Sequence, residues 1–449
     1  MASPAAATTE RATAHNQMTL LERLRSLKRP ADLDSTYLTH GIHPYAAKYI
    51  PQLPRMIIEE HTNERHTVFD PFCGSGTSLL EAALLGRKSI GTDCHPIATL
   101  IARAKTTTLE PCELEQVQRF ATELPARVFP HLSDSEEIPA MRSLRQWFSP
   151  PAIQELAFLR GRIRRMPADN VRQFLECMLS SIIVSVSNQE SETRYAAKLK
   201  QIGSGHTIFR FKRKLIKELA AIENLSKIPR VRRNPPKIIM ADLTDPREIG
   251  FIEPDSVDLI VTSPPYPNSY DYYLYHKWRL IWLGFDVDRV KQAEIGSRNE
   301  YSSKRAPIET FIDRMHLAFI SIGRMLKPSK LAYFFVGDAV IDGQFHDMEL
   351  VYREISKGTS LRYVGGSNYE LSEVTRSFHE KASANCHGGK KNQQKKQHVL
   401  VFEKVNSFRM CVSRSGVTRA KATPVPIATR VSLGKNIANG STVSKICGQ

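Results

Sequence analysis

The chain has 449 residues and carries 63 Lys and Arg against 46 Asp and Glu, a formal net charge of +17. Its length allows about two or three domains, or one large domain with insertions. No stretch approaches the roughly 18 uninterrupted apolar residues of a membrane span, and residues 1–19 lack the apolar segment of a secretory signal, so we expect a cytosolic protein. Seven scattered cysteines without a CxxC pair exclude a dense disulfide scaffold and indicate no structural metal. The positive charge favours a polyanionic partner.

The chain divides by composition and periodicity into five segments. Residues 1–34 are expected to form a flexible arm, and residues 406–449, which contain no Asp or Glu, a flexible basic tail. Residues 35–108 alternate short apolar runs with helical patterns, which predicts a parallel sheet. Residues 109–236 show long helical periodicities and are expected to be a helical insertion. Strand patterns return in residues 237–405, so the α/β fold is expected to resume there.

The individual elements follow from the same patterns. Strands are expected at residues 67–69, 88–91, 237–243, 257–263, 330–337 and 398–404, and helices at residues 78–85, 98–104, 151–163, 171–187, 210–225 and 310–326.

A glycine-rich turn follows the first expected strand. The segment VFDPFCGSGT (residues 68–77) passes through Gly74 and Gly76 into the next helix. Glycine lets the backbone pass close to a ligand, and a helix N-terminus offers unpaired N–H groups. The pattern is neither GxGxxG nor a P-loop, which disfavours nucleoside phosphates.

Two acidic residues stand at the tips of the first two strands. Asp93 could accept both hydroxyls of a ribose, and Asp70 would suit a cationic group such as the α-ammonium of an amino acid. Together they indicate S-adenosylmethionine as the cofactor. The alternative is that both carboxylates are ordinary strand-end caps.

The strand at residues 257–262 ends in Ser263, Pro264, Pro265 and Tyr266. Two prolines fix the backbone and leave carbonyls as acceptors. An exocyclic amine could donate to the Ser263 hydroxyl and the Pro264 carbonyl, while Tyr266 stacks on a base turned out of the helix. The amine would then accept a methyl group in line, without a covalent intermediate. Positioning alone can contribute about 7–11 kcal/mol to such a step.

The motifs FDPFCGSGT and TSPPY together resemble those of the DNA amino-methyltransferases, and the serine in TSPPY is closer to the cytosine-N4 branch than to the adenine-N6 branch. Residues 43–51 are similar to the family segment that closes over the methionine end of the cofactor. Residues 240–243 resemble its third-strand segment, whose acid lies near the adenine amine, and residues 326–338 resemble a later core strand. The resemblance covers residues 38–108 and 237–405. It implies an α/β, Rossmann-like class I methyltransferase fold with a mostly parallel seven-stranded sheet and a helical insertion.

The resemblance implies transfer of a methyl group from S-adenosylmethionine to cytosine N4 in double-stranded DNA at a specific sequence. It also implies a restriction-modification system, with a cognate restriction endonuclease as partner. Alternatives are an adenine-N6 DNA methyltransferase and, ranked below it, an RNA base methyltransferase or a non-catalytic DNA-binding module. The predicted catalytic residues are Ser263, Pro264, Pro265 and Tyr266, and the predicted cofactor-binding residues are Tyr45, Lys48, Asp70, Pro71, Phe72, Gly74, Ser75, Gly76, Thr77, Asp93 and Asp242.

One departure from the family pattern affects the target-recognition region. The large insertion precedes residues 240–242 instead of directly preceding TSPPY. Residues 109–236 are the first choice for this region, with residues 267–307 or 367–396 as additions.

Several polar and aromatic clusters allow two interpretations. The basic clusters at residues 160–165 and 230–233 could contact phosphates or form a solvated helical face. Residues 187–195 could read base edges or cap a helix. Tyr270 and Tyr273 could line a base pocket or belong to the core, whereas Trp278 and Trp282, at helical spacing, are expected in the core.

Overall fold

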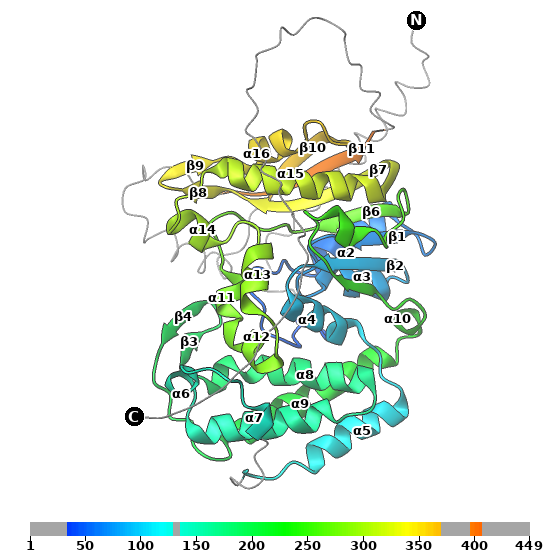
Figure 1. Ribbon diagram of the computed structural model, residues 1–449. Helices are drawn as coiled ribbons and strands as arrows, with labels where there is room; N and C mark the ends of the chain where they lie inside the picture. Colours follow the sequence, from blue (N-terminus) through cyan, green and yellow to red (C-terminus); the bar gives the residue numbers. More distant parts are fainter. Residues whose placement is uncertain (1–33, 129–134, 370–395, 406–449) are drawn as a thin grey trace, which may run out of the picture. The chain divides into compact units, whose positions relative to one another are not determined.

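The computed structural model describes residues 34–128, 135–369 and 396–405 (Figure 1). Its centre is a seven-stranded sheet with the order β10-β11-β7-β6-β1-β2-β5. The strands are β1 (Thr67–Asp70), β2 (Lys88–Asp93), β5 (Lys237–Met240), β6 (Val257–Thr262), β7 (Leu326–Gly337), β10 (Leu361–Tyr369) and β11 (Gln397–Lys404). Of these seven strands, only β11 runs in the direction opposite to the other six. The predicted Rossmann-like, mostly parallel sheet of seven strands is confirmed.

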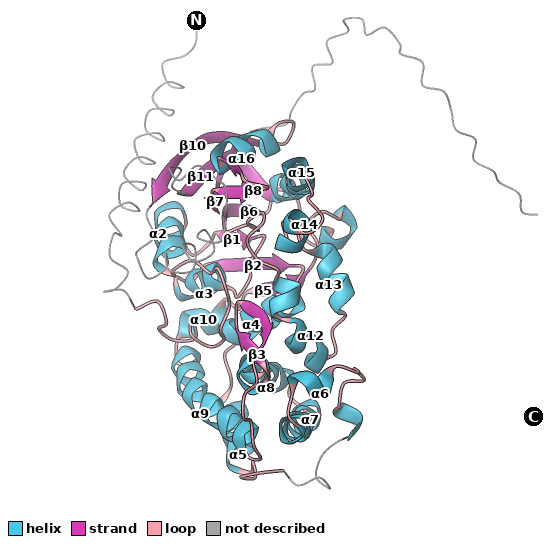
Figure 2. Ribbon diagram, turned by 90° about the vertical axis from the view of Figure 1, so that its left-hand side faces the viewer, coloured by secondary structure: helices cyan, strands magenta, loops and turns pink. Residues whose placement is uncertain are grey.

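Helices cover both faces of the sheet, as Figure 2 shows for α2, α3 and α15. On one face lie α2 (Gln52–His61) and α3 (Thr77–Leu84), and on the other lie α15 (Ile308–Met325) and α16 (Met348–Ser356). In β7, Tyr333 and Phe335 pack with α2, whereas Phe334 packs with α15 and α16. This alternation follows from the two-residue period of a strand that is buried on both faces.

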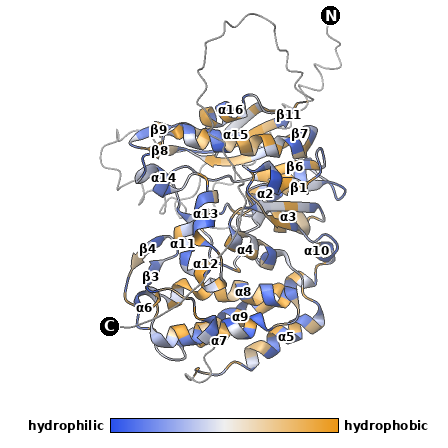
Figure 3. Cartoon of the chain, in the orientation of Figure 1, coloured by the Kyte–Doolittle hydropathy of each residue, from blue (hydrophilic) through white to orange (hydrophobic). Residues whose placement is uncertain are grey.

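The insertion is helical, as predicted, and packs on α4 (Pro96–Thr106). Its helices are α5 (Pro111–Thr122), α6 (Leu144–Trp147), α7 (Pro150–Arg164), α8 (Asp169–Ile182), α9 (His206–Ser226) and α10 (Pro229–Arg233), with 3-10 turns η3 (Ser135–Glu137) and η4 (Val184–Val186). Ile97 and Ile101 of α4 share one apolar core with Leu156 and Phe174 of the insertion. Figure 3 shows that α8 and α9 carry both hydrophobic and hydrophilic residues, as expected for helices with one buried side.

A chain of short helices connects β6 to α15. These are α11 (Tyr272–Tyr275), α12 (Lys277–Leu283), α13 (Val287–Ala293) and α14 (Arg298–Ser302). Trp278 and Trp282 are buried, which confirms their predicted place in the core, and Tyr273 is buried as well. In Figure 1, α11, α12 and α13 lie between the sheet and the insertion.

Most predicted elements are present, with ends that differ by a few residues. The helix expected at residues 171–187 ends at Ile182 and is followed by η4. Residues 187–195 mainly form a hairpin of β3 (Gln189–Ser191) and β4 (Arg194–Ala197). No strand pattern predicts it, because its two strands are short and do not alternate apolar and polar residues. The sequence patterns also miss η5 (Pro246–Ile249), the hairpin β8 (Ala339–Ile341) and β9 (Gln344–His346), and β10.

Residues 1–33, 406–449 and most of the segment 367–396 lie outside the described residues, and with them the predicted arm and tail. No helix among the described residues has the length and apolar character needed to cross a bilayer.

Candidate active site

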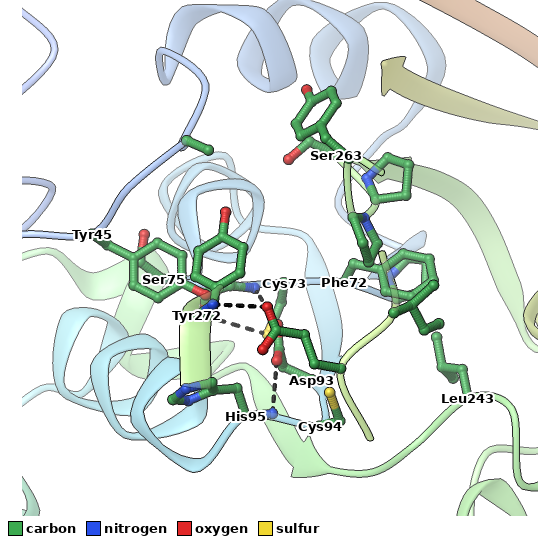
Figure 4. Close-up of a pocket in the computed structure, with 18 of the residues that line it drawn as sticks. Tyr45, Phe72, Cys73, Ser75, Asp93, Cys94, His95, Leu243, Ser263 and Tyr272 are labelled. Atoms are coloured by element: carbon green, nitrogen blue, oxygen red, sulfur yellow. Dashed lines mark hydrogen bonds between the residues drawn. The ribbon is translucent and has the colours of Figure 1, made fainter. Parts of the chain in front are cut away.

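One cavity joins the glycine-rich turn to the loop that follows β6. Its lining comes from the turn after β1, the tip of β2, the segment after β5, the loop after β6, the segment before α2 and the region of α11–α13; the residues are Tyr45, Ala47, Lys48, Tyr49, Pro71, Phe72, Cys73, Gly74, Ser75, Thr77, Asp93, Cys94, His95, Ala241, Asp242, Leu243, Ser263, Pro264, Pro265, Tyr266, Tyr272, Val290, Ala293, Glu294 and Ile295. In Figure 4, Tyr45, Ser75 and Tyr272 gather on one side, with Phe72 and Leu243 on the other. The cavity therefore brings the two predicted motifs together.

The glycine turn has the conformation that requires glycine. Gly74 and Gly76 have φ of 47° and 77°, a region that side chains disfavour. A Cβ on Gly74 would lie 3.2 Å from a ring carbon of Tyr45, and a Cβ on Gly76 would lie 2.9 Å from the Cβ of Ala102 in α4. Gly74 thus lines the cavity, whereas Gly76 lies outside the lining and lets the turn pack on α4.

Asp93 lines the cavity at the tip of β2. Its carboxylate accepts hydrogen bonds from the backbone N–H of Gly74 and of His95, both at 2.9 Å. Burial raises the pKa of Asp93 to about 6. The two backbone bonds fix the carboxylate at the cavity wall and leave it acceptor capacity, since an ionised carboxylate offers about four lone-pair sites.

Asp70 does not reach the cavity, which differs from the prediction that it faces a cationic group of the cofactor. The carboxylate is buried and accepts from the hydroxyls of Ser78 at 2.7 Å and Thr262 at 2.6 Å. Burial raises its pKa to about 6. Asp70 therefore connects the ends of β1 and β6 beneath the site. Apart from Asp70 and Gly76, all predicted catalytic and cofactor-binding residues line the cavity.

The loop after β6 presents the Ser263 hydroxyl to the cavity. In the described part of the chain, no hydrogen bond involves the Ser263 side chain, which lines the cavity. The Tyr266 hydroxyl donates to the Phe335 carbonyl of β7 at 3.1 Å, which fixes the ring. Asn268 holds the far end of the loop, because its N–H donates to the Gly296 carbonyl at 3.0 Å. Both anchors follow Ser263 in the chain, and β6, which ends at Thr262, fixes the chain before it.

Twelve lining residues are absent from the predicted site, Tyr272 and Glu294 among them. The Tyr272 ring stacks on Tyr45, with centroids 5.6 Å apart and planes at 20°. The Glu294 carboxyl accepts from the N–H groups of Tyr272 at 2.7 Å and Tyr273 at 3.0 Å. Tyr272 lies between Tyr270 and Tyr273, two candidates for the base pocket, and this is a usable signal. A single Glu at the end of a short helix is not. Tyr270, by contrast, does not belong to the lining.

Five of the seven arginines in the two basic clusters of the insertion pair with acidic side chains of the same chain. Arg160 and Arg164 both contact Glu137 at 3.1 Å, and Arg162 contacts Glu123 at 2.8 Å. In the second cluster, Arg230 and Arg232 contact carboxylates at 3.7 and 2.5 Å. These contacts favour the solvated helical face over phosphate contacts for the two basic clusters.

The lining residues fit S-adenosylmethionine. Phe72, Leu243 and Ile295 offer apolar surfaces for a purine. Asp93 offers a carboxylate for ribose hydroxyls, and the absence of a Cβ at Gly74 leaves the turn open beside Tyr45. The donor and acceptor set therefore matches a nucleoside with a polar extension.

Comparisons with known proteins agree with this geometry. A family model described as DNA methylase matches residues 21–103. The Type II methyltransferase M.MvaI of Kocuria varians is 26% identical over 266 residues, which cover 56% of this chain and 59% of that protein. The resemblance to the DNA amino-methyltransferases is confirmed.

Two further similarities are weaker. The Type II methyltransferase M.MjaII of Methanocaldococcus jannaschii is 23% identical over 395 residues, which cover 69% of this chain and 73% of that protein. The solved geranyl diphosphate C-methyltransferase of Streptomyces coelicolor is 7% identical with a TM-score of 0.31, covering 87% of this chain and 98% of that one. The chain spans 59% of the length of M.MvaI, which is less than two thirds of that relative.

Proposed function

We propose that the chain is a DNA methyltransferase that transfers a methyl group from S-adenosylmethionine to the N4 amine of cytosine in double-stranded DNA. The observation that carries this proposal is the single cavity shared by the glycine turn, Asp93 and the TSPPY loop. When bound, S-adenosylmethionine supplies a methyl group on a positively charged sulfur.

The chain's own residues would position the amine and prepare its nitrogen. The Ser263 hydroxyl and the Pro264 carbonyl would each accept one N–H of the amine, which raises the electron density on nitrogen. Tyr266, held by its bond to Phe335, would stack on the extruded base. After transfer the nitrogen carries one proton too many, and this proton would pass to water. A fixed pocket of this kind acts mainly by orientation.

The choice of cytosine rests on the serine of TSPPY, since the adenine branch usually carries Asp or Asn there. The decisive assay incubates duplex DNA with the chain and labelled S-adenosylmethionine, followed by digestion and mass spectrometry of the nucleosides. N4-methylcytosine is expected. N6-methyladenine as the sole product would overturn the cytosine assignment, and preferential labelling of structured RNA would overturn the DNA assignment.

Variants test the loop itself. Ser263→Ala and Tyr266→Ala should each reduce methyl transfer by at least about tenfold to a hundredfold, as expected for a lost catalytic hydrogen bond or stacking contact. Ser269→Ala is the matched control, because Ser269 lies in the same loop but outside the cavity lining, and its activity should be unchanged. Full activity in both loop variants would remove the catalytic assignment.

We further propose that the insertion, residues 109–236, contains the target-recognition region. Its hairpin β3–β4 is fixed beside the segment that follows the TSPPY loop: the Gln189 side chain donates to the Tyr275 carbonyl at 3.3 Å, and Arg279 contacts Glu192 at 2.5 Å. The wider proposal is a modification enzyme in the cytoplasm with a cognate restriction endonuclease. Sequencing that detects methylated bases, applied to DNA of cells that express the chain, would test it by revealing the recognised sequence.

A further inference from the structure

Lys105 has a buried side-chain amine beside the cavity. It stands in the last turn of α4 with 1% of its surface exposed, and its Nζ donates to the Ser75 hydroxyl at 3.0 Å. In the described part of the chain, no carboxylate oxygen lies within ion-pair distance of its Nζ. Burying a charge without a counter-ion is costly, so the protonated form of this amine would be stabilised by an anion that the polypeptide does not supply.

The nearby carboxylate cannot serve this purpose because other groups hold it. Glu81 accepts from His40 at 2.7 Å and from Arg55 at 3.1 Å, and also from the hydroxyl of Tyr37. Burial, and then the neighbouring charge of Lys48, hold the pKa of Lys105 well below its ordinary value. The amine thus lies in surroundings where an added negative charge would be favourable.

Ser75 connects Lys105 to the cavity. Its side chain is buried but lines the cavity, and Figure 4 shows it beside Tyr45. Because Lys105 donates to the Ser75 oxygen, the hydroxyl proton of Ser75 is free to donate in turn. Lys48 lines the cavity too, and its Nζ donates to the carbonyl of His40 at 3.0 Å. The cavity is therefore lined by two hydrogen-bond donors, Ser75 and Lys48. Lys105 does not line the cavity but contacts the Ser75 hydroxyl.

We propose that the Lys105–Ser75 pair positions the carboxylate of the cofactor's amino-acid part, with Lys105 acting through Ser75 as a positioning residue. This inference rests on the proposed function. A carboxylate is the only anionic group of S-adenosylmethionine, and the charged lining contributed by the strand tips, Asp93 and Asp242, is acidic. The cationic end near Lys48 is where that group would be stabilised by charge and hydrogen bonds.

The test is calorimetric binding of two nucleosides to the full chain without DNA. S-adenosylmethionine carries the carboxylate, and decarboxylated S-adenosylmethionine lacks only that group. Lys105→Met, which keeps the length and apolar stem of the side chain, should raise the Kd for S-adenosylmethionine about 10- to 100-fold and leave the Kd for the decarboxylated compound within about twofold. Ser75→Ala should give the same pattern, and the double variant should bind no more weakly than the weaker single variant.

The matched control is Lys214→Met. Lys214 of α9 lies outside the cavity lining, and unlike Lys105 it has a carboxylate partner, because its Nζ lies 2.8 Å from Glu218. Both Kd values should be unchanged in this variant. Equal weakening of both nucleosides in Lys105→Met and Ser75→Ala, or no weakening in either variant, would overturn the inference while leaving the proposed function intact. Failure of the unaltered chain to bind either nucleoside would instead overturn the proposed cofactor.

Discussion

Replacing Glu294 by Gln should remove a pH-dependent loss of stability. Glu294 is 8% exposed and lines the cavity, and its two oxygens accept backbone N–H groups at the start of α11. Burial raises its pKa from 4.5 to about 8, against the lowering effect of those hydrogen bonds, and Asp271 and Asp93 raise it further. At neutral pH the side chain is therefore mostly protonated and uncharged. Glutamine shares its shape and lack of charge but replaces one of its two acceptor oxygens by an NH2 group that cannot accept a hydrogen bond.

The sign and size follow from proton linkage. The folded chain holds this proton between pH 4.5 and about 8, whereas the unfolded chain has lost it. The stabilisation is therefore complete below pH 4.5 and decreases as the pH rises to about 8, by about 1.4 kcal/mol per pH unit. Over that window the loss approaches 5 kcal/mol as an upper value, a large share of the 5–15 kcal/mol of a typical domain. Glu294→Gln should lack this loss.

The measurement is urea unfolding of both chains at pH 5, 6.5, 8 and 9. We expect Glu294→Gln to be about 1–3 kcal/mol less stable than the unaltered chain at pH 5, because its NH2 group leaves one backbone N–H at the start of α11 without an acceptor. The difference should shift in favour of Glu294→Gln up to pH 8, with no further change at pH 9. Glu136→Gln, which removes an exposed carboxyl of η3, serves as control and should follow the unaltered chain. A constant difference between Glu294→Gln and the unaltered chain at every pH would refute the argument.

Three other substitutions test separate parts of the site. Gly76→Ala should destabilise the chain by about 2–4 kcal/mol in urea unfolding, because strain at positive φ adds to a clash with α4. The control Gly343→Ala has the same φ of 77° but lies in open space, so it should cost only about 1–2 kcal/mol. Equal losses of stability in the two variants would contradict the clash. Asp93→Asn should raise the cofactor Kd about 10- to 100-fold in calorimetry, as for a lost charge-assisted bond; an unchanged Kd would remove its predicted ribose contact. Arg279→Met should lower the free energy of unfolding by about 2–4 kcal/mol, because it removes a buried guanidinium that bonds Ser180, His276 and Glu192. A free energy of unfolding within about 0.5 kcal/mol of the unaltered chain would argue that apolar packing replaces these bonds.

Sequence patterns were enough to predict where the two motifs meet. Residues 71–77 and 263–266 each follow a parallel strand, and the carboxyl ends of such strands open at the same edge of a sheet. Because β1 and β6 are neighbours, the two loops share one cavity. The glycine positions were predictable for the same local reason, since a tight turn between strand and helix needs positive φ at Gly74 and Gly76.

Side chains whose role depends on long-range burial were not predictable in the same way. Asp70 stands at a strand tip like Asp93, and nothing in the local sequence distinguishes them. Ser78 and Thr262 supply hydroxyls from α3 and β6 that enclose the Asp70 carboxylate, whereas Asp93 is bound only by backbone N–H groups at the cavity wall. The difference between the two acids is thus set by which elements pack over each strand end.

The same reasoning limits what charge can say about the insertion. Arg160 appears in the sequence within a run of four arginines, a pattern typical of phosphate contacts. Its partner Glu137 is 23 positions earlier and reaches it only through the packing of η3 on α7. Arg279, isolated in the sequence, instead fixes the polar hairpin β3–β4 next to α12. Within the insertion, a contact with DNA is therefore better sought on this anchored hairpin than on the arginine-rich helix.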